Sequence, residues 1–143
     1  MNPNRVKRNE LLAQKVIKGL ESRNMSGYYA ADKEEALKIA LSLIPEGCKV
    51  THGGTVTVEE IGLEAELQSG KFEYCNRVAA ADKRAAELFA YDADVYVGSV
   101  NAMTEDGVLV NIDGNANRVS AYAYGPKKLV LIVGMNKIAK DAD

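Results

Sequence analysis

The chain has 143 residues, of which 47% are hydrophobic and 27% are charged, which is typical of one folded domain with its own core. With a formal net charge of −2, the chain lacks the surplus of basic residues that neutralises phosphates, so a nucleic-acid partner is not expected. Two cysteines and one histidine make neither a zinc ligand set nor a disulfide framework, and a reducing, cytoplasmic compartment is expected.

We predict a single domain over residues 1–143, with an N-terminal helical segment over about 4–44 and an α/β core over about 48–139. The longest strongly apolar run, Leu129–Met135, is too short to span a bilayer, so no membrane span is expected.

The N-terminal segment predicts two amphipathic helices. The first covers Asn4–Arg23, where apolar residues recur at helical spacing on one face. The second begins at Asp32, which with Glu35 three residues later is typical of a capping box. The run Pro45-Glu46-Gly47 is expected to end it.

The middle of the chain predicts a strand, a turn and a helix in close succession. A strand over 48–51 runs into His52-Gly53-Gly54-Thr55, and Thr57 with Glu60 is expected to cap the following helix. A weaker strand over 72–74 and an alanine-rich helix over 79–90 come next.

The second half of the chain predicts strands over 94–99, 108–112 and 129–133. The last of these is apolar throughout, which is typical of a strand buried on both faces of a parallel sheet. Helices that alternate with short apolar strands indicate βαβ units. The predicted fold class is therefore α/β, with a Rossmann-like, mostly parallel sheet flanked by helices.

Ligands of open α/β sheets bind beyond the carboxyl ends of the strands. Four polar segments follow predicted strands, at Thr51–Thr57, Ser99–Asp106, Asn111–Arg118 and Gly134–Lys137. The Gly53-Gly54 turn is compatible with close approach of an anion to a helix N-terminus, and equally with a tight turn that binds nothing. It matches neither the P-loop nor the GxGxxG fingerprint.

The most polar stretch is Asn101–Arg118, and two interpretations of it remain open. Asp106 and Asp113 are candidate catalytic carboxylates, whereas a simple hairpin turn also accounts for Asp106. Arg118 and Lys137 are candidate receptors for an anionic group, although most such side chains are solvated. The predicted ligand-binding residues are Gly53, Gly54, Thr55, Asn101, Thr104, Asp106, Gly107, Asn111, Asp113, Asn117, Arg118 and Lys137.

Four blocks, in order along nearly the whole chain, resemble the LUD domain, the family of lactate-utilisation protein C and related bacterial proteins. The blocks are Arg23-Asn-Met-Ser-Gly-Tyr-Tyr29, Gly53-Gly-Thr-Val-Thr57 with Glu60-Ile-Gly62, Asn101-Ala-Met-Thr-Glu-Asp-Gly107 through Asn111-Ile-Asp-Gly114 to Asn117-Arg118, and Gly125-Pro-Lys-Lys128 to Gly134-Met-Asn-Lys137.

The resemblance implies a fold like that of the NagB/RpiA/CoA-transferase group and a role in conversion of L-lactate to pyruvate. It implies a small anionic ligand and iron–sulfur partner proteins, which would carry the redox clusters, because this chain shows no cofactor motif of its own. The alternative is a stand-alone enzyme or binding module for a phosphorylated, CoA-like or folate-like ligand. A homo-oligomer is compatible with either function.

The chain departs from the family pattern at three places. Relatives usually carry glycine where this chain has Ala116, and many carry Asp-Arg where it reads Asn76-Arg77, which removes a carboxylate. Some longer relatives continue into a cysteine-bearing segment, whereas this sequence stops at Asp143.

Overall fold

The computed structural model describes residues 2–77 and 79–143. The helices are α1 (Pro3–Ser22), α2 (Lys33–Ser42), α3 (Val56–Glu60), α4 (Leu63–Leu67), α5 (Lys83–Asp92), α6 (Asn117–Tyr124) and the short 3-10 helix η1 (Met135–Lys137). The strands are β1 (Lys49–His52), β2 (Glu73–Cys75), β3 (Val95–Gly98), β4 (Ala102–Thr104), β5 (Leu109–Val110), β6 (Lys128–Leu131) and β7 (Ile138–Ala139).

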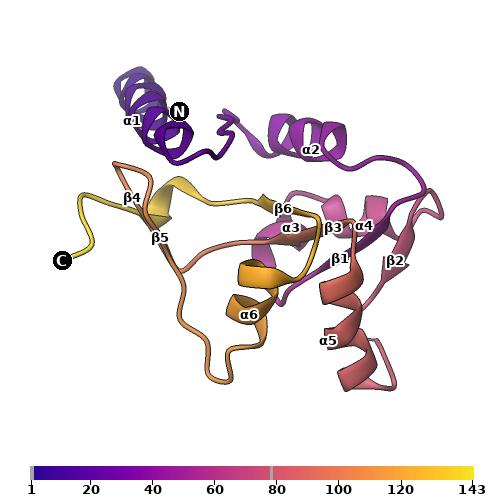
Figure 1. Cartoon of the computed structure of the whole chain (residues 1–143). Helices are drawn as coiled ribbons and strands as arrows, with labels where there is room; N and C mark the ends of the chain where they lie inside the picture. The colour runs from indigo at the N-terminus through magenta and orange to yellow at the C-terminus, as the bar shows by residue number, and fades with distance from the viewer. Residues whose placement is uncertain (1, 78) are drawn as a thin grey trace.

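The main sheet has four strands in the order β2-β1-β3-β6, and every neighbouring pair is parallel. In Figure 1 these strands form the middle layer of the molecule, with α1 and α2 above them and α5 and α6 below. The predicted class is therefore confirmed, because the chain is an α/β protein with a mostly parallel, Rossmann-like sheet flanked by helices.

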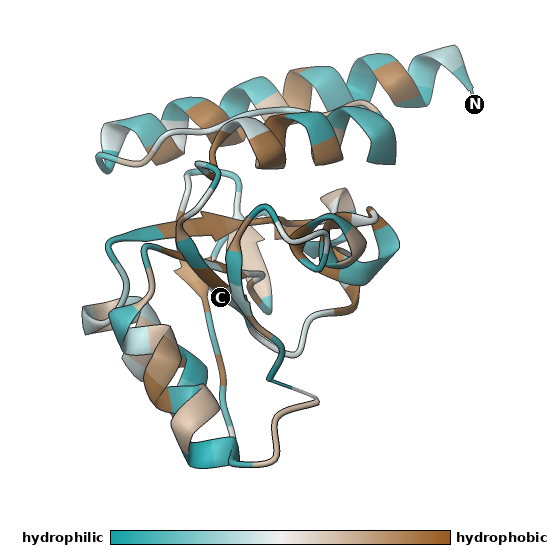
Figure 2. Ribbon diagram, turned by 90° about the vertical axis from the view of Figure 1, so that its right-hand side faces the viewer, coloured by the Kyte–Doolittle hydropathy of each residue, from teal (hydrophilic) through white to brown (hydrophobic). Residues whose placement is uncertain are grey.

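The two faces of this sheet pack against different helices. Apolar residues of α2, α3 and α4 make one core with β1, β3 and β6, in which Val50, Val58, Leu63 and Val97 are fully buried. Ala90 of α5 and residues of α6 pack on the opposite face. Figure 2 shows the strands mostly in brown and the helices divided between teal and brown. Burial of one apolar stripe per helix explains this layered arrangement.

A second, three-stranded sheet was not expected from the sequence. Strand β4 pairs with β5 as an antiparallel hairpin and with β7 in parallel. Val16 on α1 packs against Val100 and Met103, next to this hairpin. The helix therefore covers the second sheet, and the β4–β5 hairpin connects the main sheet to α1.

The contact between α1 and the hairpin is backbone against backbone. A Cβ added at Gly107 would lie 2.6 Å from both Gly19 C and Leu20 N, and one added at Gly19 would collide with the backbone of Asp106. Gly107 also has a φ of +88°, a conformation that costs other residues free energy. Arg23, at the end of α1, adds a hydrogen bond to this contact by donating to the carbonyl of Asp106 at 3.2 Å. Two glycines therefore set how closely the two elements approach.

Most sequence expectations for the first half are confirmed. The first helix begins and ends within one residue of its predicted bounds, and it buries Ala13 and Val16. Asp32 caps α2 by accepting a hydrogen bond from the Glu35 N–H at 2.8 Å, and the Glu35 carboxylate accepts one from Ala31 N–H at 2.9 Å. The strands predicted over 48–51 and 72–74 are present as β1 and β2, each shifted by one residue. The strand predicted over 94–99 is present as the slightly shorter β3.

Three local predictions were wrong. Thr57 does not cap α3, because Thr55 occupies the N-cap position without a side-chain hydrogen bond. The alanine-rich helix begins only at Lys83, since Asp82 caps it by accepting from the Ala85 N–H at 3.1 Å. The last apolar strand is not buried on both faces, because β6 lies at the edge of the sheet and only its Val130 is buried.

Replacing Gly107 with alanine should lower the free energy of unfolding by about 2–4 kcal/mol, from the left-handed backbone and the close contact together. Urea denaturation would measure the loss. Gly114→Ala is the matched control, because a Cβ there meets nothing within 4 Å and its φ is not in the left-handed range. Equal stability of the two variants would contradict the proposed backbone contact.

Candidate functional site

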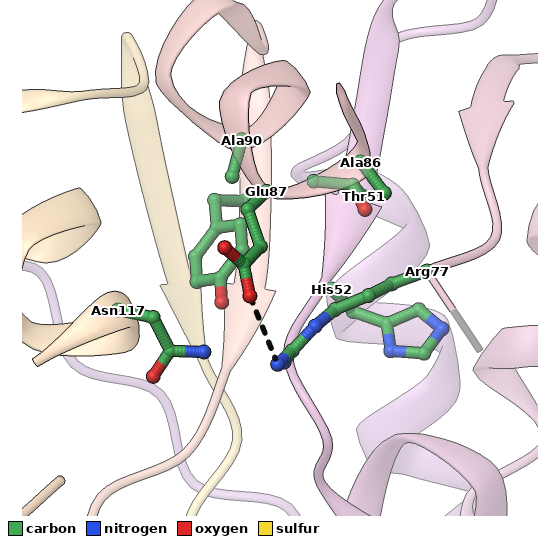
Figure 3. Close-up of a pocket in the computed structure, with 8 residues that line it drawn as sticks. Thr51, His52, Arg77, Ala86, Glu87, Ala90 and Asn117 are labelled. Carbon is green, nitrogen blue, oxygen red and sulfur yellow. Dashed lines mark ion pairs between the residues drawn. The ribbon is translucent and has the colours of Figure 1, made fainter. Parts of the chain in front are cut away.

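The strand order places a topological switch point between β1 and β3. From β1 the chain adds β2 on one side, and it then adds β3 and β6 on the other. Open α/β sheets bind ligands in the crevice that such a reversal leaves beyond the carboxyl ends of the two strands. A cavity of about 10 Å³ lies there, lined by Thr51, His52, Arg77, Ala86, Glu87, Ala90, Tyr96 and Asn117 (Figure 3).

Tyr96 of β3 lines this cavity and is 4% exposed. A Cβ at Gly53 would lie 2.9 Å from the Tyr96 hydroxyl, so the first glycine of the Gly53-Gly54 turn leaves room for that ring. Burial raises the pKa of the Tyr96 hydroxyl, while the positive charges of Arg77 and Arg118 oppose the rise. Two cationic side chains therefore act on one buried phenol at the switch point.

Arg77 reaches the cavity from the loop after β2, and Glu87 reaches it from α5. Their closest charged atoms are 3.9 Å apart, and the two side chains are 33% and 39% exposed. Figure 3 shows the Arg77 guanidinium extending toward Glu87, with the Asn117 amide directed into the same space. A long, partly solvated ion pair of this kind contributes little stability, so separation of the two side chains costs little free energy.

His52 ends β1 beside the cavity and is almost completely buried. The Gly53 carbonyl can only accept, so His52 Nδ1 donates to it at 2.7 Å, and His52 Nε2 forms a hydrogen bond of 2.7 Å with the Tyr74 hydroxyl. The His52 and Tyr74 rings also stack with centroids 5.7 Å apart. Both ring nitrogens are thus occupied, which favours a packing role over acid–base chemistry.

Asp113 and Arg118 form the best-buried ion pair of the described residues, with 10% and 21% of their side chains exposed and 2.9 Å between charged atoms. The second Asp113 oxygen accepts the Val119 N–H in the first turn of α6 at 2.7 Å. The chain's own carboxylate therefore occupies the helix N-terminus, where it interacts favourably with the helix dipole. With both oxygens bonded, Asp113 is poorly placed to act as a general base.

Arg118 connects α6 to the hairpin through further hydrogen bonds. It donates to the Asn101 side-chain oxygen at 2.5 Å and to the Ile112 carbonyl at 3.3 Å, and it lies over the Tyr122 ring. Asn101 also accepts the Ile112 N–H at 2.9 Å. These contacts assign Arg118 first to holding the loop over 111–116 against the sheet.

Three buried polar atoms near this loop have no hydrogen-bond partner within the described ranges, namely Ser99 Oγ, Asn111 Oδ1 and Arg118 Nε. An unsatisfied buried polar atom costs about 1–3 kcal/mol. Such atoms are the positions at which a bound molecule could recover that cost, and all three belong to residues around Asn101. They extend the candidate site from the switch point toward the hairpin.

The other half of the predicted Asn101–Arg118 cluster faces α1 instead. The Thr104 hydroxyl donates to the Asp106 carboxylate, which also pairs with Arg23 at 3.3 Å. The pKa of Asp106 is lowered, mainly by the hydrogen bond from Thr104. A hydrogen bond with the backbone of Asp106 itself and the positive charge of Arg23 lower it further. Asp106 and Asp113 share no partner, so the structure does not assemble them into a catalytic pair.

The remaining predicted residues lie outside the cavity. Gly54 is exposed with open space around it, and Thr55 begins a helix of only five residues. Lys137 ends η1 and does not line the cavity at the switch point. The structure thus brings Gly53 and Asn117 to the switch point, places Asn101, Asp113 and Arg118 beside it, and leaves Thr104, Asp106 and Gly107 in the contact with α1.

Sequence reasoning placed Thr51 and His52 in a predicted polar segment but missed Arg77, Glu87 and Tyr96 among the polar residues that line the cavity. Arg77 carried a usable signal, because it is the charged residue that follows the carboxyl end of β2. Glu87 carried none, since its place on an amphipathic helix resembles that of any solvated charge.

An open parallel sheet with a cavity at its switch point defines this protein as an α/β domain with a candidate site beyond its strand ends. The sequence model of the LUD domain family matches residues 13–143. The chain therefore belongs to the LUD domain family. No curated protein matches the chain.

Replacing Asp113 with asparagine should lower the free energy of unfolding by about 1–3 kcal/mol, because the poorly exposed guanidinium of Arg118 would lose its negatively charged partner. Urea denaturation at neutral pH would measure this. Asp106→Asn is the control, since its side chain is 66% exposed and its loss should be clearly smaller. A larger loss for Asp106→Asn would reverse the assignment.

Replacing Tyr74 with phenylalanine should lower the free energy of unfolding by about 1–3 kcal/mol, because His52 Nε2 would be left buried without its hydrogen-bond partner. Burial, as the largest cause, raises the pKa of Tyr74 from 10.0 to about 12. The stability that the neutral phenol contributes is present in full below the unfolded pKa and is lost as the pH rises toward the folded one.

Alkaline titration of stability tests this second effect. The wild type should lose stability between the unfolded and folded pKa values of Tyr74, and Tyr74→Phe should lose less over the same range. An identical alkaline slope in both proteins would show that Tyr74 ionises as freely in the folded state as in the unfolded one.

Proposed function

We propose that this protein is a component of L-lactate to pyruvate conversion that binds a small anionic ligand, the carboxylate of a 2-hydroxy or 2-oxo acid, at the switch point of its sheet. Membership of the LUD domain family supports the pathway. The position of Arg77 supports the ligand class, because a guanidinium can bind a carboxylate through two parallel hydrogen bonds.

The single observation that carries the proposal is the loose pairing of Arg77. Its distance of 3.9 Å from Glu87 contrasts with the 2.9 Å between Arg118 and Asp113. Two arginines oppose the rise that burial causes in the pKa of Tyr96. Arg118 pairs closely with Asp113, whereas Arg77 pairs only loosely with Glu87. Arg77 is therefore the cation that can leave its internal partner for a ligand carboxylate with little loss of stability. The Asn117 amide lines the same cavity and can donate to a second oxygen of the ligand.

Oxidation of a 2-hydroxy acid to a 2-oxo acid removes two electrons and two protons, so the reaction needs an acceptor. We assign that acceptor to iron–sulfur clusters of partner proteins, and we assign to this domain the binding and orientation of the acid. The polar atoms around Asn101 stay within the proposed ligand surface as secondary positions, whereas Lys137, which does not line the cavity, is the alternative position for the anion. A cytoplasmic location and a homo-oligomeric state are proposed on the same basis as the pathway.

Replacing Arg77 with glutamine should weaken binding of L-lactate and of pyruvate roughly tenfold to a hundredfold, the equivalent of one lost charge-assisted interaction. Isothermal titration calorimetry on the full chain would measure both affinities. Lys137→Gln removes a cation beyond the end of β6 and serves as the comparison, with an affinity close to that of the wild type.

Retained affinity in Arg77→Gln together with loss in Lys137→Gln would move the anion site to the segment Gly134–Lys137. Circular dichroism of both variants would separate loss of the site from loss of the fold. Full lactate oxidation by the partner proteins in the absence of this domain would overturn the pathway assignment.

A further inference from the structure

A second hollow adjoins the cavity at the switch point. A groove of about 450 Å³ lies between α5 and α6, lined by Arg84, Glu87, Leu88, Tyr91, Asn115, Asn117 and Ser120. Glu87 and Asn117 line both this groove and the cavity beside Arg77. The two spaces are therefore neighbours that share these two side chains.

The volumes of the two spaces suit different parts of one ligand. About 10 Å³ holds roughly one water molecule, so the cavity as it stands accommodates little more than one polar atom. The groove, at about 450 Å³, lies within the range of about 300–1,000 Å³ that is usual for organic ligands. Lactate has only a methyl group beyond its reacting carbon and would leave this groove empty.

The wall of the groove on α5 offers an apolar surface between polar residues. Leu88 is 52% exposed although it lies in the middle of α5, and Tyr91 lines the same wall. The Tyr91 hydroxyl and the Ser120 hydroxyl bond to each other at 2.5 Å, so each satisfies part of the other's hydrogen-bonding capacity. An aromatic or branched group placed against Leu88 and the Tyr91 ring would remove apolar surface from water.

We infer that the α5–α6 groove binds the side chain of an organic acid whose carboxylate is bound by Arg77. This inference rests on the proposed function, and it changes the expected ligand from lactate itself to 2-hydroxy acids with larger side chains. Glu87 is the internal competitor in this arrangement, since it pairs with Arg77 at 3.9 Å and stands where the cavity meets the groove. Binding replaces Glu87 by the carboxylate of the ligand.

The test compares two acids with the same head group, L-lactate and L-3-phenyllactate. Calorimetry on the full-length chain should give a phenyllactate affinity on the order of tenfold higher, because the phenyl ring is buried in the groove. Leu88→Ala should remove most of that advantage and leave L-lactate binding unchanged. Leu11→Ala is the matched control, a leucine that is 61% exposed on α1, and it should change neither affinity.

Glu87→Gln tests the internal competition. Without its negative charge, Arg77 should bind both acids several-fold more tightly, and the gain should shrink at high salt. Unchanged affinities in Glu87→Gln would overturn the role of Glu87 as a competitor.

The outcomes separate this inference from the proposed function. If L-lactate binds through Arg77 and phenyllactate binds no more tightly, or if Leu88→Ala affects both acids alike, the groove is not part of the site and the proposed function stands. If phenyllactate binding depends on Arg77 and Leu88 while L-lactate does not bind, the groove is confirmed and lactate is the wrong ligand. If neither acid binds, both proposals fail.

Discussion

The burial of strand β3 is the constraint on which the rest of the structure depends. All four of its residues are buried, because β1 and β6 pair with its edges while helices cover both of its faces. Its Val95 and Val97 belong to the core with α2, α3 and α4, and its Tyr96 to the core with α5 and α6. The same strand therefore fixes both helical layers and places the Tyr96 hydroxyl at the switch point.

Close approach around this strand requires glycine at two positions. Gly53 leaves space for the Tyr96 hydroxyl, and Gly98 lies directly against the hydroxyl of Tyr122, which donates to the Ser99 carbonyl at 2.8 Å. The Gly-Gly turn is therefore part of the site, although its first glycine makes room for a tyrosine rather than for a ligand. A larger residue at Gly53 would have to displace the buried ring of Tyr96, and one at Gly98 the partly buried ring of Tyr122.

The charges of the candidate site fall into a fixed pair and an exchangeable one. Arg118 and Asp113 are poorly exposed and bonded to a helix N-terminus, and they hold the loop that starts α6. Arg77 and Glu87 are more exposed and farther apart. Interactions between charges strengthen as water is removed, so the first pair stabilises the fold, while the second leaves a cation available to a ligand. In the proposed function, this division separates the pair that stabilises the fold from the pair that takes part in binding.

Hydrophobic periodicity and local capping determined α1, α2, the strands of the main sheet and the α/β class, because these depend on neighbours a few residues apart. The capping of α2 by Asp32 is of this local kind. The sequence also marked 101–118 as rich in polar groups, yet only tertiary structure divided them between α1 and the switch point. The cavity likewise brings Thr51, Arg77 and Glu87 together from separate elements. Strand order and helix packing decide such contacts, and neither leaves a local pattern in the chain.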